Sequence, residues 1–464
     1  MPIVAVDDTD SRDRGMCTTY VGVRLGARLE AAGGEVSRRL LVRLNPAVKH
    51  KTRGNAAVAL HVEGVDADET FRIAGKTVRE FAAAEDPRTS PGVVVADVAV
   101  DPAGTDADAG LVDGVDDLST RIPGDVASFA RRALRERLAL ADALALADRH
   151  GFRHAGFGSG GADGDGTPGR GRIGALAAVG APAAHDEWTF ERISYRELDR
   201  CGTPREVDAE SVFAAADEAY PTVWDTVDRG TGEAVCVPNA PGPILHGIRG
   251  DDPGACRRVA DAIASEPVER AATFLTNQGT DAHLADGSLG DLRDGAGYRV
   301  TGVVADDPET KRGGHVHVAV AAALDDDASP ELRAVAFAPT GRFRDRVRAL
   351  RPGDRVTLCG EHEVRDGGSG PSGTLKLEKF AVRDLVRTEP TTPTCPECGR
   401  RMSSAGRDQG YRCRDCDTAA PGKIEATIER DLEPGWYEVP PSARRHVAKP
   451  LVRGGFDAPV HPER

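Results

Sequence analysis

The amino-acid sequence predicts a multidomain protein of mixed α and β structure, and three observations support this prediction. The chain has 464 residues, more than one hydrophobic core normally organises, so we expect three or four domains. Five short strand-like segments recur between residues 298 and 380, which is typical of a small β-barrel of the OB-fold type. Two Cys-x-x-C pairs then follow within a short stretch, as in a zinc ribbon.

The N-terminal segment combines a strand, an acidic loop and a helix. Residues 3–6 form a short apolar run, and from residue 18 to residue 32 apolar side chains recur with helical spacing. Between them the chain carries Asp7, Asp8, Asp10 and Ser11. Carboxylates at a strand end, facing a helix N-terminus, suit Mg²⁺ and a nucleotide phosphate, because the hard cation prefers oxygen ligands and free N–H groups attract anions. The alternative is an acidic loop that caps the helix, since Asp, Ser and Thr are preferred N-cap residues.

Two further segments are candidates for binding phosphate. In Lys51-Thr52-Arg53-Gly54-Asn55 the two cations could contact phosphate oxygens, although a solvated turn explains the same residues. Residues 169–174 lead into an apolar helical stretch, where the backbone at Gly171 and the guanidinium of Arg172 can converge on an anion. The glycine- and aspartate-rich residues around Ser159 match a pyrophosphate-binding loop only superficially, and we interpret them as a flexible insertion.

The middle of the chain predicts a small α+β domain followed by the barrel. Acidic residues 101–117 are linker-like, and residues 126–147 predict one long amphipathic helix. Residues 276–283 hold too many donors and acceptors for a core element, so we expect a polar loop or part of a site. The predicted barrel strands are residues 298–304, 315–322, 335–338, 355–359 and 374–380.

Charge and hydropathy limit the classes of protein. The formal net charge is −14 and the positive charge is almost entirely arginine, which is typical of adaptation to high salt. At 1 M salt the Debye length falls to about 3 Å, so an acidic total does not exclude a nucleic-acid partner. We find no apolar run long enough to span a bilayer and no secretory signal pattern, so we expect a cytoplasmic protein without a membrane partner.

Cysteines and arginines mark the C-terminal part. Four of the nine cysteines form two knuckles that can complete a closed tetrahedral zinc site: Cys395, Cys398, Cys413 and Cys416. A redox Cys-x-x-C pair is the alternative, but it leaves the second knuckle unexplained. The other cysteines are scattered singly, which argues against a disulfide framework. Arginines around the knuckles and the basic segment Arg444-Arg445-His446 are candidates for contacting an RNA backbone; a solvated terminal segment is the alternative for the latter.

Taken in order, these segments resemble the archaeal 2-agmatinylcytidine synthetase family, which modifies an isoleucine tRNA. The match covers nearly the whole chain and rests on residues 7–11 with 15–20, 51–55, 171–180, 247–250, 276–283, the barrel, the four cysteines and residues 443–446. The chain departs from the family at the insertion of residues 159–168 and at Arg172, where an apolar residue is expected. The resemblance implies a kinase-like ATP-binding domain over residues 1–155, a ferredoxin-like domain over 156–290, an OB fold over 291–388, and a zinc ribbon with basic tail over 389–464.

The resemblance also implies a reaction in which agmatine replaces the C2 oxo group of the wobble cytidine in the CAU-anticodon isoleucine tRNA, which then reads AUA. An oxo group leaves poorly, so we expect activation by phosphoryl transfer from ATP with Mg²⁺ at the acidic loop. The implied roles are phosphorylation for Thr18, ATP contacts for Ser11, Lys51, Arg53, Gly171 and Arg172, substrate contacts for Asp281 and His283, and tRNA contacts for Arg444, Arg445 and His446. For Thr18 the alternative is a simple N-cap.

Two other functions remain open at this point. A non-catalytic RNA-binding protein could be built from an OB fold and a zinc ribbon, but it leaves the acidic loop unexplained. A different ATP-dependent enzyme could modify the base by adenylation through the loop around Ser159. No stable protein partner is implied.

Overall fold

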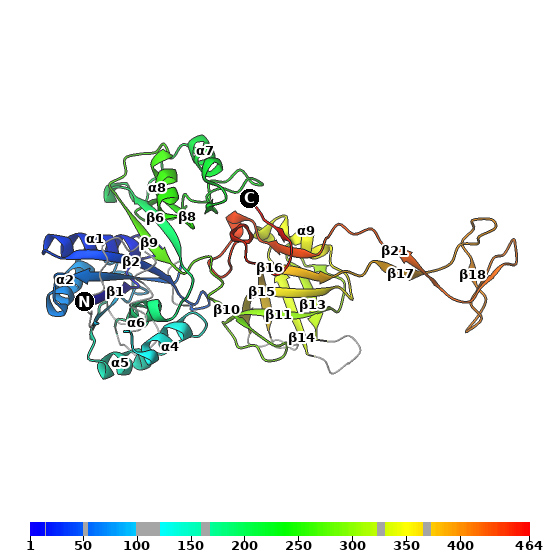
Figure 1. The fold of residues 1–464 in the computed structure, drawn as a ribbon, viewed down its shortest axis with the longest axis horizontal. Helices are drawn as coiled ribbons and strands as arrows, with labels where there is room; N and C mark the ends of the chain where they lie inside the picture. Colours follow the sequence, from blue (N-terminus) through cyan, green and yellow to red (C-terminus); the bar gives the residue numbers. More distant parts are fainter. Residues whose placement is uncertain (14, 50–53, 99–120, 159–167, 323–329, 365–372) are drawn as a thin grey trace.

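The computed structural model describes residues 1–13, 15–49, 54–98, 121–158, 168–322, 330–364 and 373–464 (Figure 1). Lys51, Arg53, the acidic residues 101–117 and the loop around Ser159 lie outside these described residues. Within them, none of the helices combines the length and the apolar composition that crossing a bilayer requires.

The N-terminal half is organised by one nine-stranded sheet, with strand order β5-β4-β1-β3-β2-β9-β6-β8-β7. Its neighbours are antiparallel except β2 and β9, which pair in parallel through Leu40 with Leu275 and Leu41 with Thr276. That single pairing makes the predicted kinase-like and ferredoxin-like parts one continuous sheet. The strands are β1 (Pro2–Asp7), β2 (Glu35–Arg43), β3 (Ala56–Glu63), β4 (Gly92–Asp97), β5 (Arg153–Gly156), β6 (Thr189–Tyr195), β7 (Val223–Trp224), β8 (Ile244–Gly250) and β9 (Arg270–Thr276).

Helices cover both faces of this sheet (Figure 1). Because successive strand side chains point to opposite faces, Val4 and Val6 pack with α1 and α2, whereas Ile3 and Ala5 share a core with α4, α5 and α6. Apolar side chains of α7 and α8 belong to the same core as Ile3 and Ala5. The helices are α1 (Thr18–Ala31), α2 (Ala67–Phe81), α4 (Gly124–Ala133), α5 (Leu140–Arg149), α6 (Arg172–Gly180), α7 (Ala209–Ala219) and α8 (Pro253–Ala262).

The prediction of a single helix over residues 126–147 is wrong, because the structure has two helices, α4 and α5, with a break between them. The carbonyl of Ala133 accepts a hydrogen bond from the backbone N–H of Asn45 at 3.0 Å, so it is committed outside the helix. Arg135, in the break, donates to the carbonyls of Ala282 and Leu284. Contacts with distant segments therefore interrupt a pattern that is locally helical.

A closed barrel follows, as predicted. Strands β11 (Gly297–Val304), β13 (Val316–Ala321), β14 (Glu331–Ala336), β16 (Thr374–Asp384) and β15 (Arg355–Glu363) pair in a ring that returns to β11. Strand β14 lies earlier than the predicted residues 335–338, because Pro339 belongs to a 3₁₀ turn that ends it. The short strands β10 (Leu284–Asp286) and β12 (Glu309–Thr310) and the helix α9 (Phe343–Arg348) complete the domain.

The cysteine-rich segment extends away from the barrel on a two-stranded stalk (Figure 1). The stalk pairs β17 (Thr388–Thr391) with β21 (Ile424–Thr427), and the ribbon itself contains β18 (Ser403–Ser404), β19 (Tyr411–Arg412) and β20 (Ala419–Ala420). The chain then returns, since β22 (Gly435–Glu438) pairs with β16 and β23 (Val460–His461) pairs with β22. The C-terminal tail thus packs on the barrel.

Candidate functional site

The acidic loop lies where β1 ends, against the first turn of α6. Asp7 is the last residue of β1 and is 8% exposed. A Cβ atom on Gly174 would lie 1.9 Å from Asp7 Oδ2, so glycine in α6 makes room for this carboxylate. Asp8 follows with a φ of 56°, in the left-handed region that few non-glycine residues adopt. The chain therefore turns sharply and keeps the acidic side chains at one end of the strand.

The two carboxylates have raised pKa values. Burial raises the pKa of Asp7 well above its usual range, and the neighbouring charges of Asp8 and Asp10 add to this. Burial also raises the pKa of Asp8 to about 6, against the opposing effect of Arg170. Carboxylates held together in a buried position without full charge compensation fit a divalent cation, which favours their ionised form. The donor set is entirely oxygen, as Mg²⁺ prefers.

Arg170 is a site residue that the sequence analysis did not select. Its guanidinium donates to Asp8 Oδ2 at 2.9 Å and to the carbonyl of Arg88 at 2.9 Å. The backbone N–H groups of Gly169 and Arg170 both donate to Ser90 Oγ, which fixes the loop beside the carboxylates. The only signal available in the sequence was its place, two residues before the selected Arg172 in the same Gly-Arg-Gly-Arg run.

Arg172 itself turns back onto its own loop. As the first residue of α6 it donates to the carbonyls of Gly169 at 3.0 Å and Pro168 at 2.7 Å. The carboxylates instead open into a pocket of about 350 Å³, whose described lining includes Arg170 and Gly171 and not Arg172. Further lining residues are Asp7, Asp8, Asp10, Leu44, Lys49, Asn55, Glu136, Arg137, Leu138 and Gly174. We call it the carboxylate pocket.

A second pocket, of about 230 Å³, is lined by Asp10 and Thr18. Asp10, Gly54 and Ala56 line both pockets, so the two spaces meet there. Thr18 is 6% exposed, and its Oγ1 accepts a hydrogen bond from Thr9 Oγ1 at 3.1 Å. We call this space the threonine pocket.

The helix-cap alternative does not account for these residues. Cys17 is the N-cap of α1, and its side chain makes no capping hydrogen bond. Thr18 is the first helical residue, so it is not the N-cap. Ser11 directs its hydroxyl to Asp86 Oδ2 at 2.6 Å, and with Arg88 it lowers the pKa of Asp86.

An ion-paired carboxylate forms the far wall of the threonine pocket. Glu191 accepts from Arg43 at 2.9 Å and from Arg249 at 3.2 Å. Burial acts to raise the pKa of Glu191, but the two guanidinium groups outweigh it and lower the pKa. Arg249 lies in the segment 247–250, on which the family resemblance partly rests. Its partner Glu191, in β6, could not be predicted as a site residue from the sequence.

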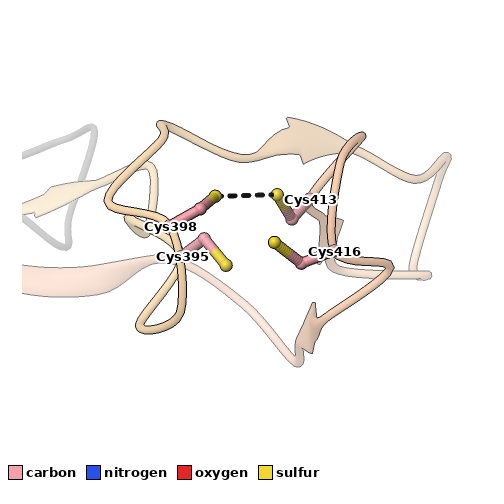
Figure 2. Close-up of side chains that lie close together, drawn as sticks. All are labelled: Cys395, Cys398, Cys413 and Cys416. Atoms are coloured by element: carbon pink, nitrogen blue, oxygen red, sulfur yellow. Dashed lines mark hydrogen bonds between the residues drawn. The ribbon is translucent and has the colours of Figure 1, made fainter.

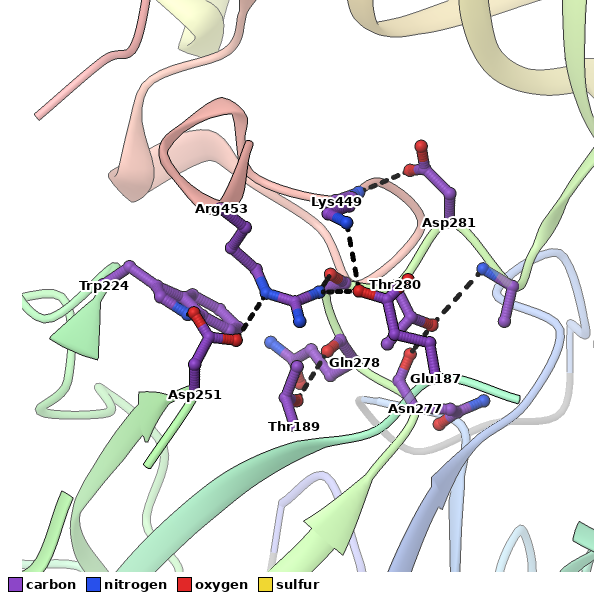
Figure 3. Close-up of polar contacts among 12 residues, drawn as sticks. Glu187, Thr189, Trp224, Asp251, Asn277, Gln278, Thr280, Asp281, Lys449 and Arg453 are labelled. Carbon is purple, nitrogen blue, oxygen red and sulfur yellow. Dashed lines mark hydrogen bonds and ion pairs between the residues drawn. The ribbon is translucent and has the colours of Figure 1, made fainter. Parts of the chain in front are cut away.

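The polar residues 276–283 form a junction between the sheet, the barrel and the C-terminal tail (Figure 3). Asp281 accepts from the buried Lys379 Nζ of the barrel at 2.6 and 2.8 Å, and from the backbone N–H of Lys449. Arg453 of the tail donates to Asp251 at 2.7 Å and pairs with Glu187 at 2.9 Å. Asp281 is thus engaged away from both pockets.

The other polar candidates at the C-terminal side also make internal contacts. His283 Nε2 donates to the carbonyl of Arg43 at 3.2 Å, and its ring lies 5.2 Å from that of His446. His446 Nε2 donates to the carbonyl of Leu44 at 3.3 Å. Arg444 is buried and pairs with Asp225 and Glu438, and Arg445 pairs with Glu361 and Glu378. Residues 444–446 therefore hold the tail against the barrel and the sheet in this structure.

The four ribbon cysteines lie together as their spacing predicts (Figure 2). Their sulfur atoms all lie within 4.8 Å of one another, with Cys398 and Cys413 at 3.5 Å. The ribbon's own apolar cluster is small, built around Cys395, Met402 and Cys413. Four thiolates in this arrangement fit a tetrahedral zinc ion, which supplies the folding energy that so small a core lacks.

Comparison with known proteins gives a consistent assignment along the chain. Family models match residues 3–67 and 63–159 (TiaS TCKD domain), 169–283 (TiaS FLD domain) and 392–432 (TiaS C-terminal zinc ribbon domain). The chain is 50% identical to the isoleucine-tRNA 2-agmatinylcytidine synthetase TiaS of Haloquadratum walsbyi, with all of both chains covered. It is 42% identical to that of Methanosarcina mazei, with 97% of each covered.

Solved structures agree over the full length. A complex of TiaS with its isoleucine tRNA and ATP matches with a TM-score of 0.81 at 36% identity, covering 100% of this chain and 99% of that one. A complex of TiaS with the same tRNA, AMPCPP and agmatine matches with a TM-score of 0.79 at 34% identity, again covering 100% and 99%. The family resemblance seen in the sequence is confirmed, and the chain belongs to the TiaS family of isoleucine-tRNA 2-agmatinylcytidine synthetases.

Proposed function

We propose that this protein attaches agmatine to C2 of the wobble cytidine of the CAU-anticodon isoleucine tRNA, at the expense of ATP. Relatives that carry the name of this activity, and solved relatives described as complexes with an isoleucine tRNA, ATP and agmatine, support these substrates. The observation that carries the proposal is that the carboxylate pocket and the threonine pocket meet at Asp10. Because tRNA is a cytoplasmic substrate, we place the reaction in the cytoplasm.

The proposed chemistry has two steps. The C2 oxygen first attacks the γ-phosphorus of ATP, a new O–P bond forms, the bond to the bridging oxygen breaks and ADP leaves. This converts the poor leaving group at C2 into a phosphate. The primary amine of agmatine then attacks C2, the new C–N bond forms, and the C2–O bond breaks with departure of inorganic phosphate and a proton from the amine. The first step needs the phosphoryl donor and the base on adjacent sides of one group of residues, and the second step needs the amine beside the same base.

The carboxylate pocket suits the triphosphate. Asp7, Asp8 and Asp10 would hold Mg²⁺, which neutralises charge as the phosphoryl group transfers. The N-terminus of α6 points its positive dipole end at the same pocket, and Lys49 and Arg137 add cationic side chains to the lining. We keep Lys51 and Arg53 as predicted phosphate contacts, since they follow Lys49 closely in the sequence.

The threonine pocket suits the acceptor side of the reaction. We propose that the Thr18 hydroxyl, beside Asp10, is the site of the family's phosphothreonine, and that the cytosine and the amine enter this pocket. The base must leave its stack to reach such a pocket. Exposed arginines on the ribbon can contact the tRNA backbone while this happens: Arg401, Arg407, Arg412 and Arg414.

The test is transfer of labelled agmatine to tRNA transcripts in KCl-rich buffer with ATP and Mg²⁺. We expect label on isoleucine tRNA with a CAU anticodon and none on the methionine CAU transcript. Asp10→Asn and Thr18→Val should each lower the rate by about 100-fold or more, since each removes a group at the reacting centre. Arg153→Gln breaks an exposed pair between Arg153 of β5 and Asp68 of α2, and neither residue lines the two pockets. It is the matched control and should keep the parent rate. Absence of label from the parent protein contradicts the proposal.

A further inference from the structure

Arg170 occupies the carboxylate that the proposed cation needs. Its guanidinium lies 2.9 Å from Asp8 Oδ2, and the backbone N–H of Ser90 donates to the same oxygen at 3.2 Å. The side chains of Arg170 and Asp8 are 21% and 11% exposed, so the pair faces the pocket. In this arrangement Arg170 is the positive charge that compensates Asp8.

A divalent cation on Asp8 disfavours this arrangement. Two positive charges would then share one carboxylate, and at about 4 to 5 Å their repulsion amounts to several kcal/mol in a partly buried site. Mg²⁺ binding therefore favours departure of the guanidinium from Asp8. Its backbone does not need to move, because Ser90 Oγ holds the N–H groups of Gly169 and Arg170.

The displaced guanidinium has one obvious destination. Arg170 lines the carboxylate pocket, which is the space assigned to the triphosphate. A guanidinium matches phosphate oxygens geometrically and forms short, charge-assisted hydrogen bonds with them. The hydrogen bond to the Arg88 carbonyl is a contact about which the side chain can turn.

We propose that Arg170 exchanges partners during nucleotide binding: it pairs with Asp8 in the empty site and moves to the triphosphate when Mg²⁺ takes Asp8. The inference rests on the proposed Mg²⁺–ATP site and adds a residue to it. It means that Arg170 competes with Mg²⁺ when nucleotide is absent and assists binding when nucleotide is present. A single substitution should therefore change two affinities in opposite directions.

The experiment measures both affinities by isothermal titration calorimetry on the full chain in KCl-rich buffer. In Arg170→Gln, Mg²⁺ should bind to the nucleotide-free protein about 2- to 5-fold more tightly, because its competitor is gone. The same variant should bind a non-hydrolysable ATP analogue with Mg²⁺ about 10- to 100-fold more weakly, since it lacks a charge-assisted contact. Asp8→Asn is the control for binding of Mg²⁺ to acidic residues on the surface. Arg153→Gln is the control for charge, because it removes one positive charge away from the pocket.

The outcomes separate the proposal from a structural role. Weaker binding of both Mg²⁺ and nucleotide, or an unchanged Mg²⁺ affinity, overturns the exchange. Arg170→Lys keeps a cation on the loop and guards against a folding defect; it should show both changes with the same signs and smaller size. Neither titration contains tRNA or agmatine. If these affinities change as expected and the parent protein transfers no agmatine, the proposed function is contradicted and the exchange stands.

Discussion

The side-chain amide of Asn277 forms two hydrogen bonds with the backbone of Arg43. Its Oδ1 accepts from the Arg43 N–H at 2.8 Å, and its Nδ2 donates to the Arg43 carbonyl at 3.0 Å. The parallel pairing of β2 and β9 ends at Leu41 and Thr276, so Asn277 continues it with a side chain in place of a strand. The guanidinium of Arg43 then reaches Glu191 in the threonine pocket, and the polar junction thereby positions one wall of that pocket.

Asn277→Ala should impair catalysis beyond its effect on stability. Loss of the two buried hydrogen bonds should lower the free energy of unfolding by about 1–3 kcal/mol and kcat/KM for agmatine transfer by about 10-fold, because Arg43 is no longer held. Ser37→Ala, which removes a hydrogen bond to the His61 carbonyl elsewhere on β2, is the control. Denaturant unfolding and steady-state kinetics give the two readouts. Equal activities for Asn277→Ala and Ser37→Ala contradict a positioning role.

Gly174→Ala should weaken nucleotide binding with little loss of the overall fold. The added methyl group would lie 1.9 Å from Asp7 Oδ2, so the carboxylate must shift away from the pocket. We expect the affinity for a Mg²⁺–ATP analogue to fall at least about 10-fold, as measured by calorimetry. Gly124→Ala, at the start of α4, places its methyl group in open space and should bind like the parent. An unchanged nucleotide affinity in Gly174→Ala contradicts a role for the Asp7 carboxylate in nucleotide binding.

Acid should destabilise the protein partly through buried histidines. Burial lowers the pKa of His61 to about 3, below the value of about 6.5 in the unfolded chain. The unfolded state therefore binds more protons below pH 6.5, so stability that is present above pH 6.5 is lost as the pH falls toward 3. The His61→Leu variant cannot be protonated at this position. Between pH 7.5 and pH 5 its free energy of unfolding should therefore fall by about 2 kcal/mol less than that of the parent. Parallel pH profiles of denaturant unfolding for the two proteins contradict this.

Zinc should stabilise the ribbon and leave the body of the molecule unaffected. Cys413→Ser should release the ion, unfold the ribbon and weaken tRNA binding, while the affinity for nucleotide stays within about twofold of the parent. Metal analysis, a tRNA filter-binding assay and calorimetry measure these three effects. Cys201→Ser, a single cysteine outside the ribbon, should keep full zinc content. Loss of nucleotide binding in Cys413→Ser contradicts independent folding of the ribbon.

The sequence predicted those structural elements that depend on residues close together in the chain. The short apolar run in β1, the helical spacing in α1 and the paired cysteines all correspond to observed elements. The break between α4 and α5 could not be predicted, because Asn45 and residues 282–284 cause it from far along the chain. The union of two predicted domains in one sheet likewise depends on the long-range pairing of β2 with β9.

The candidate site was partly predictable for the same reason. Asp7, Asp8, Asp10 and Thr18 are close in sequence, and the structure brings them together around two joined pockets. Glu191 and Arg170 reach those pockets through tertiary contacts, which no local spacing indicates. Asp281 has the right chemistry for a cationic substrate, but a buried lysine of the barrel already holds it.

The most direct test of the central claim follows one oxygen atom. Isoleucine tRNA carrying ¹⁸O at C2 of the wobble cytidine is incubated with the protein, ATP, Mg²⁺ and agmatine, and the released products are analysed by mass spectrometry. Phosphoryl activation predicts that the ¹⁸O leaves in inorganic phosphate, in step with agmatine incorporation. Recovery of the ¹⁸O in AMP would instead mean adenylation of the base, and recovery in water would mean displacement without activation; either result contradicts the account.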